Sequence, residues 1–138
     1  MPLTFTLTEN ILPAGKEKDA FQQLSAAMLR WHGLEGNGVM TPNVVGSIHL
    51  LPLSNTMSGG TETPVVFIEW KVPSFAFSTQ EIRSGYFDEA TTIIHGLSDG
   101  RHPRDRVFIN VVHTVDGAWN MDGRAMTDAE LLDRIAQG

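Results

Sequence analysis

The sequence of 138 residues predicts an α+β fold in which two consecutive β-α-β units form a four-stranded sheet with two helices on one face. Two observations predict this class. Apolar residues recur with strand spacing in four short segments and with helical spacing in two longer ones, and these segments follow one another as strand, helix, strand, repeated once. Such units favour parallel pairing within each unit and right-handed crossovers. Residues 1–138 are expected to form a single domain, since this length is typical of one.

The first unit begins with an alternation of apolar and polar side chains over residues 3–7, which is the period of a half-buried strand. A helix follows, whose apolar stripe recurs every three or four residues: Phe21, Leu24, Met28 and Trp31. Glycines within residues 33–38 end this helix. The second strand is expected over Val44–Leu51, where Pro52 closes it.

The second unit starts after an expected loop, Ser54–Thr63. Its strand, Pro64–Val72, opens with a continuous apolar run, which is typical of a strand covered on both faces. Ser78 and Glu81 fit a capping box that satisfies free N–H groups at a helix start. The helical stripe then contains Ile82, Tyr86, Ala90, Ile93 and Leu97. The fourth strand is expected over Val107–Val112.

The C-terminal segment adds a second capping box, Thr127 with Glu130, and a short helix. With both main helices on one face, the other sheet face would be bare. Apolar side chains such as Phe5, Val45 and Ile109 would not all be tolerated in water. We therefore expect an oligomer that stacks bare sheet faces against each other.

Composition excludes several classes of function. The absence of cysteine excludes disulfides, thiolate catalysis and cysteine-based metal sites. A formal charge of −6 argues against nucleic-acid and anionic-membrane partners, which favour a basic face. No apolar run reaches the ~20 residues that span a bilayer. The start of the chain lacks the pattern of a signal peptide, so a cytoplasmic protein is expected.

The sequence has neither a Gly-x-Ser-x-Gly elbow nor a phosphate-binding glycine loop, so no motif supports a hydrolase or a nucleotide-binding protein. No cofactor is expected. The Gly59-Gly60 pair alone is too short to hold a phosphate. His49 and His113 lie on different expected strands without a third ligand at suitable spacing. A zinc site uses three or four ligands, so no metal site is expected.

Pro2 is the residue whose chemistry depends most on its position. If Met1 is cleaved, the nitrogen of Pro2 becomes a free secondary amine. An ordinary α-amino group has a pKa of about 7.7–8.0, and burial in an apolar pocket lowers it. An amine that titrates near neutrality can both take and return protons. The alternative is that proline is merely tolerated near the chain end.

Three further stretches follow the Met1-Pro2 start in a recognisable order. They are Ile48–Pro52 continuing into Ser58–Pro64, then Asp105–Asn110, then Gly117–Asn120. Together with Pro2 they resemble the tautomerase superfamily, which includes macrophage migration inhibitory factor, D-dopachrome tautomerase and malonate semialdehyde decarboxylase. The resemblance covers roughly residues 2–123 and implies this family's fold with a short C-terminal hairpin, a homotrimer, and pockets close to the subunit contacts.

The resemblance also implies roles for individual residues. Pro2 matches the catalytic proline, and Asn110 matches an asparagine that hydrogen-bonds a substrate oxygen. Phe108 stands where macrophage migration inhibitory factor has a pocket tyrosine, and Trp119 matches a tryptophan near the pocket mouth. Thr41 stands about where that protein has a lysine for a carboxylate, so this anchor is missing.

Pro73 and Phe75 lie where bacterial relatives often carry carboxylate-binding arginines. Pro73 is thus expected to border the substrate without supplying charge. Lys71 and Arg83 are the nearest cations, and Lys71 is taken as the candidate substrate ligand. Each of these residues also has a purely structural interpretation. Phe108 and Trp119 could be core or interface residues, and Lys71 could be an edge residue with a buried aliphatic stem.

The predicted function is keto–enol tautomerisation of a small, 2-oxo acid-like carbonyl compound with Pro2 as general base. A first alternative uses the protonated amine for hydration, dehalogenation or decarboxylation. A second alternative is a non-catalytic binding protein on the same fold, because a retained Met1 would leave the Pro2 nitrogen in a tertiary amide without basicity.

Overall fold

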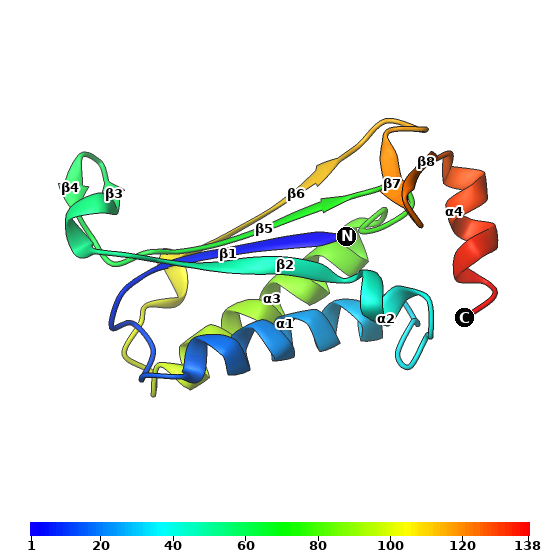
Figure 1. Cartoon of the computed structure of the whole chain (residues 1–138). Coiled ribbons are helices and arrows are strands. Elements are labelled where there is room, and N and C mark those ends of the chain that lie inside the picture. The colour runs from blue at the N-terminus through cyan, green and yellow to red at the C-terminus, as the bar shows by residue number, and fades with distance from the viewer.

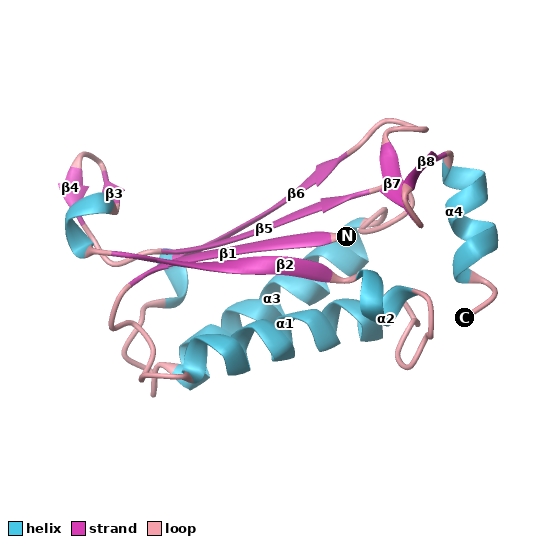
Figure 2. Ribbon diagram, viewed as in Figure 1, coloured by secondary structure: helices cyan, strands magenta, loops and turns pink.

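The computed structural model describes all of residues 1–138 and has two layers, a sheet and a pair of helices beneath it (Figures 1 and 2). The helices are α1 (Lys16–Trp31) and α3 (Gln80–Leu97). The sheet strands are β1 (Pro2–Thr8), β2 (Val45–Leu51), β5 (Val66–Val72) and β6 (Val107–His113), in the spatial order β2-β1-β5-β6. The smaller elements are α2 (Met40–Asn43), β3 (Met57–Ser58), β4 (Thr61–Glu62), β7 (Trp119–Met121), β8 (Arg124–Met126), α4 (Asp128–Ile135) and two single 3₁₀ turns, Leu53–Asn55 and Arg104–Arg106.

Both β-α-β units have the predicted parallel pairing. β1 runs parallel to β2, and β5 runs parallel to β6. The two units join in the middle of the sheet, where β1 and β5 are antiparallel. No helix combines the length and the apolar composition that a crossing of the membrane requires.

Alternation along the strands divides the sheet into a helix-covered face and an open face. In β1, Leu3, Phe5 and Leu7 are fully buried against the helices. Phe5 pairs with Ile68, which pairs with Ile109, so these three side chains share the covered face. The expectation that Phe5 and Ile109 belong to a bare face is therefore wrong. Of the three residues named for that face, only Val45 lies there, beside Pro2 in the register.

A buried hydrogen-bonded chain ties the sheet to both helices. The Nε1–H of Trp70 on β5 donates to the Tyr86 hydroxyl at 2.9 Å. That hydroxyl donates in turn to the Leu24 carbonyl on α1 at 3.0 Å. Burial raises the pKa of Tyr86, which keeps its hydroxyl protonated and able to donate. The Trp70 N–H and the Tyr86 hydroxyl thus both have partners, which offsets the cost of burying them.

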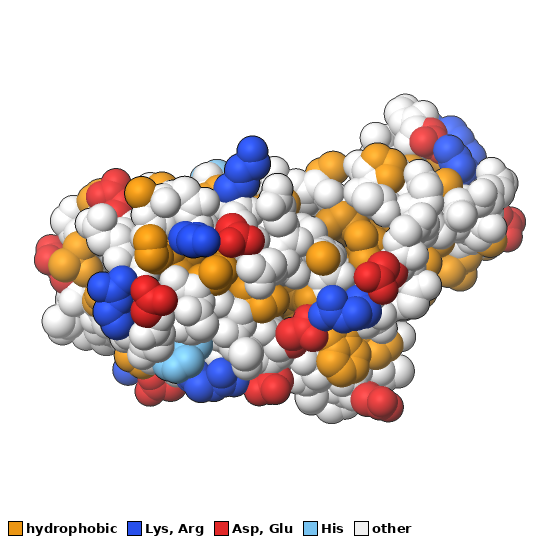
Figure 3. Space-filling model, turned by 90° about the horizontal axis from the view of Figure 1, so that it is seen from below, with side chains coloured by type: hydrophobic (Ala, Val, Ile, Leu, Met, Phe, Trp, Pro, Cys, Tyr) orange, Lys and Arg blue, Asp and Glu red, His pale blue; other side chains and the backbone are white.

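The open face carries exposed apolar side chains. Phe67 on β5 is 41% exposed, Phe108 on β6 is 42% exposed, and their rings stack with centroids 6.1 Å apart. β5 alternates between buried and accessible residues, so the predicted cover on both of its faces is wrong for the single chain. The opposite, helix-covered side has basic and acidic side chains scattered over its surface (Figure 3). The apolar sheet face is therefore the surface suited to association.

Two local details differ from the sequence predictions. The N-cap of α3 is Thr79, whose side chain accepts from the Ile82 N–H at 3.2 Å, so the predicted Ser78–Glu81 capping box is wrong. The expected loop 54–63 contains the β3–β4 hairpin, because Gly59 and Gly60 both adopt the positive φ of a tight hairpin turn. The C-terminal capping box of Thr127 and Glu130 is confirmed.

Candidate functional site

A cavity of about 380 Å³ lies at the end of the sheet where β1 begins. The N-terminus, the β7–β8 hairpin and α4 meet at this end (Figure 1). Side chains able to bind or transfer protons line it alongside apolar ones: Pro2, Asn43, Lys71, Thr114, Trp119 and Asn120. They come from four separate parts of the chain, and strand pairing together with the C-terminal hairpin brings them to one place.

The sheet register explains why Pro2 and Lys71 share this cavity. β1 pairs with β5 so that Leu3 lies opposite Trp70, which sets Pro2 alongside Lys71. Both side chains alternate onto the open face, since Leu3 and Trp70 are buried on the other. Lys71 keeps an exposed ammonium group, 3.8 Å from the Glu69 carboxylate. An exposed pair at this distance is weak, so the Lys71 charge stays available to a ligand.

The environment of the chain terminus disfavours a charged amine. Met1 is 3% exposed, and its amino group donates to the Asn43 carbonyl. Burial lowers the pKa of this amino group from 8.0 to about 5, because the charged form loses solvation. The Met1 amino group is therefore neutral at pH 7 and able to accept a proton.

Thr114 presents a hydroxyl without a partner. It follows β6, where its main-chain N–H donates to the Val72 carbonyl at 2.9 Å. Its Oγ1 atom is buried and makes no hydrogen bond, and the residue lines the same cavity as Pro2. Buried polar atoms are nearly always paired, so an unpaired one beside a candidate base is a functional signal. Its hydroxyl was not among the predicted ligands, because a lone threonine after a strand carries no sequence motif.

The C-terminal segment forms one wall of the cavity. β7 carries Trp119, which is largely buried, and Asn120. α4 is fixed to the body of the protein by Ser74, whose hydroxyl donates to Asp128, and by Asn37, whose side-chain N–H donates to the Ile135 carbonyl at 3.0 Å. The hairpin and α4 therefore close the end of the sheet as a structured unit.

The predicted site residues divide into two groups. Pro2, Lys71 and Trp119 line one cavity. Asn110 lies on the open face opposite Glu69, and Phe108 lies opposite Phe67, and neither borders this cavity within one chain. The structure thus does not bring Asn110 and Phe108 to Pro2 in the same subunit. Both lie earlier in β6, farther along the sheet from the end at which Thr114 follows this strand. Pro73 is buried in the turn after β5, where its carbonyl accepts from Ala76, and it lines no part of the cavity.

His32 lies behind the terminus and is fixed in its neutral form. The Phe77 N–H donates to Nε2 at 2.8 Å, so the proton sits on Nδ1, which donates to the Met28 carbonyl at 2.8 Å. Burial lowers the pKa of His32 below its usual 6.5. The ring therefore ties α1 to the segment before α3, where Phe77 adopts a positive φ of 51°.

The neutral His32 should make the fold less stable in acid. Its contribution is complete above its unfolded pKa of about 6.5 and is lost as the pH falls below that value, because protonated Nε2 cannot accept from Phe77. His32→Gln keeps an acceptor that does not titrate. When the pH is lowered from about 8 to about 5, the free energy of unfolding measured with urea should fall by roughly 1 kcal/mol more in the wild type than in this variant. Equal losses in both proteins would contradict the assignment.

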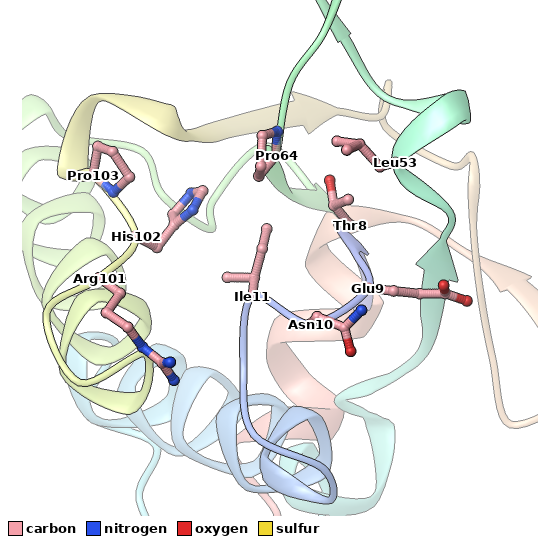
Figure 4. A pocket seen from close by; sticks show the side chains of 9 residues that line it. All are labelled: Thr8, Glu9, Asn10, Ile11, Leu53, Pro64, Arg101, His102 and Pro103. Atoms are coloured by element: carbon pink, nitrogen blue, oxygen red, sulfur yellow. The ribbon is translucent and has the colours of Figure 1, made fainter.

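A second cavity, of about 400 Å³, lies at the opposite end of the sheet (Figure 4). Three of its polar side chains are already engaged. The Thr8 hydroxyl bonds Thr56 at 2.9 Å, Nε of Arg101 donates to the Ser98 carbonyl at 3.2 Å, and Nε2 of His102 bonds the Arg106 carbonyl at 2.9 Å. The carboxylate of Glu9 points away from His102 (Figure 4). This cavity lacks a set of free acid–base groups. No group of three or more His, Asp or Glu side chains lies close enough together to hold a metal ion.

Comparison with known proteins gives no match to a family model and none to a curated protein sequence. Solved structures match over nearly the whole chain. Pt0534 inactivated by 2-oxo-3-pentynoate is 18% identical, covers 95% of this chain and 98% of its own, and has a TM-score of 0.74. F6 fused 4-OT, a wild-type asymmetric trimer, is 18% identical over 91% of this chain and 95% of its own, with a TM-score of 0.72.

A third similar structure is N1, a member of the cis-3-chloroacrylic acid dehalogenase family. It is 10% identical, covers 100% of both chains and has a TM-score of 0.73. Because the match covers both chains completely, it includes the C-terminal segment as well as the sheet and the two helices beneath it. These matched proteins are enzymes of one superfamily, in agreement with the resemblance carried by the sequence. The chain has the fold of the tautomerase superfamily.

Proposed function

We propose that this protein is a cofactor-independent tautomerase that moves a proton within a small carbonyl compound, with the amine of Pro2 as general base. One observation carries the proposal: β1 begins in a cavity at the chain terminus, where burial lowers the pKa of the Met1 amino group to about 5. Burial of a base beside a cation is the arrangement that shifts pKa values at catalytic sites. Lys71 is the cation that lines this cavity.

The chemistry requires removal of Met1. As a peptide nitrogen, the Pro2 nitrogen has no basicity and no N–H. As a free secondary amine it takes a proton from the carbon next to the substrate carbonyl and returns it at another atom. Charge then develops on the enolate oxygen, which Lys71 or the amide of Asn120 stabilises. Donors aimed at developing charge often supply the largest catalytic term.

The experiment that tests the proposal joins mass measurement with covalent labelling. Native protein is analysed by intact mass, treated with 3-bromopyruvate and digested for peptide mapping. We expect a mass lacking one methionine, a single label on the Pro2 peptide, and turnover of phenylpyruvate or 2-hydroxymuconate that falls as labelling proceeds. A label found only elsewhere, with activity unchanged, would remove Pro2 from the mechanism.

The Thr114 hydroxyl gives a further prediction for this site. Because Oγ1 has no partner, Thr114→Val should leave the melting temperature unchanged or raise it slightly. If the hydroxyl binds substrate, the same change should lower kcat/KM roughly tenfold, the equivalent of one hydrogen bond, and Thr114→Ser should retain most activity. The matched control is Ser25→Ala, which removes the other buried unpaired hydroxyl, on α1. A kinetic loss in the control as large as in Thr114→Val would contradict the assignment.

A second enzymatic candidate uses the same amine as a proton donor, in hydration, dehalogenation or decarboxylation. The observation that favours it is the Lys71 ammonium in the cavity, which can bind a substrate carboxylate where the expected arginines are missing. Halide release from 3-chloroacrylate, or carbon dioxide release from malonate semialdehyde, distinguishes this candidate from tautomerisation.

A non-catalytic role is supported by the burial of Met1, which belongs to the hydrophobic core of this chain. Protein that keeps Met1 throughout its lifetime would have no catalytic amine. The intact mass therefore separates this reading from both enzymatic ones.

We also propose that the protein assembles as a homotrimer through its open sheet face. The exposed Phe67 and Phe108 on that face and the similarity to trimeric fused 4-OT structures support this assembly. Asn110 also lies on that face, so in a trimer it would contribute to a pocket only across a subunit contact.

A further inference from the structure

The cavity at the end of the sheet opposite Pro2 contains a cation without a strong partner. Arg101 lines this cavity (Figure 4). The Ser98 carbonyl holds Nε of its guanidinium group, while Nη2 lies 4.0 Å from the Asp99 carboxylate. The side chains of this ion pair are 71% and 78% exposed, so the pair contributes little. The terminal nitrogens of Arg101 are therefore free to donate to an anion, and their planar geometry suits a carboxylate.

Apolar groups form much of the remaining wall. Ile11 projects into the middle of the cavity in Figure 4, and Leu53, Pro64 and Pro103 line it from three other segments of the chain. Leu53 is 45% exposed, so a ligand that covered it would remove apolar surface from water. Glu9 is the only acidic residue of the lining. Its carboxylate disfavours a ligand with a second negative charge.

Hydrogen bonds fix the walls of this cavity before any ligand arrives. Thr8 and Thr56 are both 2% exposed with their hydroxyls bonded to each other, and the Thr56 hydroxyl also donates to the Thr63 carbonyl at 2.9 Å. On the other side, the Oγ of the fully buried Ser98 accepts from the main-chain N–H of His102 at 3.0 Å. A ligand that meets walls already in place loses less free energy to the ordering of the protein.

We propose that this cavity is a second ligand site, separate from the Pro2 cavity, which binds a small organic monocarboxylate with a compact apolar body. Arg101 binds the carboxylate, Ile11 and Leu53 contact the apolar body, and Glu9 selects against dianions. The volume of about 400 Å³ lies within the usual range for small-molecule sites. The proposal does not depend on the catalytic role of Pro2, because the two cavities share no residue.

Benzoate is the probe for this site, with benzamide as its uncharged analogue and phthalate as the dianion. Binding is followed by methyl NMR: Ile11 and Leu53 report on this cavity, and Val45 reports on the Pro2 cavity, which it lines. We expect benzoate to shift the Ile11 and Leu53 signals until they saturate. Benzamide should bind roughly fivefold more weakly, because it lacks the charge that strengthens the bonds to Arg101. Phthalate should also bind more weakly than benzoate, and Glu9→Gln should reduce that difference.

Two variants test the residues that form the site. Arg101→Gln removes the cation and should weaken benzoate binding roughly fivefold. Leu53→Asp makes an exposed part of the wall polar and leaves the Arg101 segment unchanged, so it tests the site even if Arg101→Gln misfolds; the same loss is expected. The matched control is Arg104→Gln. Arg104 does not line the cavity and pairs with Asp88 at 3.0 Å, so benzoate affinity should stay within about twofold.

Three results would overturn the proposal. The first is benzoate binding that shifts Val45 and leaves Ile11 and Leu53 unchanged. The second is benzamide binding as tight as that of benzoate, which would mean that no cation takes part. The third is a loss in Arg104→Gln as large as in Arg101→Gln, since this would show a general effect of charge in place of a contact.

Discussion

Pro2→Ala should lower kcat/KM for phenylpyruvate or 2-hydroxymuconate by roughly 100-fold or more, because general acid–base catalysis contributes about 10²–10⁴. The variant keeps a terminal amine but loses the secondary amine and the ring that fixes it at the start of β1. Met1 must be absent from both proteins, as checked by intact mass. Pro2 is partly exposed on the open face, so the melting temperature should change little. An undiminished rate in the variant would remove Pro2 from the mechanism.

The pH dependence of kcat/KM tests the Pro2 amine independently. The end of the sheet lowers the pKa of an amino group well below the usual range, to about 5 for Met1. A base must be unprotonated to act, so kcat/KM should rise with pH through the amine's pKa and then level off. That rise should lie below the ordinary value of about 8. A rise centred at or above that value would show that the amine is not desolvated in the working enzyme.

Phe67→Lys should convert the assembled protein into monomers at micromolar concentration. In the single chain Phe67 is 41% exposed beside Phe108, so lysine can extend into solvent without disturbing the core. In a trimer formed through the open face, each copy would bury a charge where burial of phenylalanine contributes about 1.5–3 kcal/mol. Light scattering coupled to size exclusion measures the change in mass directly.

The control for this experiment is Gln22→Lys, which adds the same charge to an exposed position of α1 on the helix-covered side. It should leave the oligomer intact. Wild-type protein that is already monomeric, or a Phe67→Lys oligomer as stable as the wild type, would exclude the open face as the subunit contact.

Most of the fold could be predicted from local sequence pattern. The four strands, both long helices and their order follow from apolar spacing that is complete within each segment. The sheet face on which each side chain lies was harder to predict. Phe5 and Ile109 point toward the helices because the pairing of β1 with β5 sets one face for all strands, and that pairing joins residues about 60 positions apart. No local pattern encodes such a register.

The candidate site was predictable where a residue has distinctive chemistry by itself. Pro2 follows from its position, and Lys71 is the only cation in its strand. Thr114 and Asn120 could not be found, because their relevance comes from what surrounds them after folding. Asn110 was carried over from a family motif, and the single chain leaves it away from Pro2.

The burial of Met1 has a consequence for biosynthesis. An aminopeptidase needs a free, extended chain end, whereas in the folded chain Met1 is 3% exposed and its amino group is bonded to Asn43. β1 cannot be paired until Val45 to Leu51 and Val66 to Val72 have been synthesised, since those strands flank it. If Met1 is removed, as the proposed function requires, its removal therefore belongs to the interval in which the nascent polypeptide is still emerging from the ribosome. A molecule that completes folding first would then keep Met1, and its Pro2 nitrogen would stay in an amide without basicity.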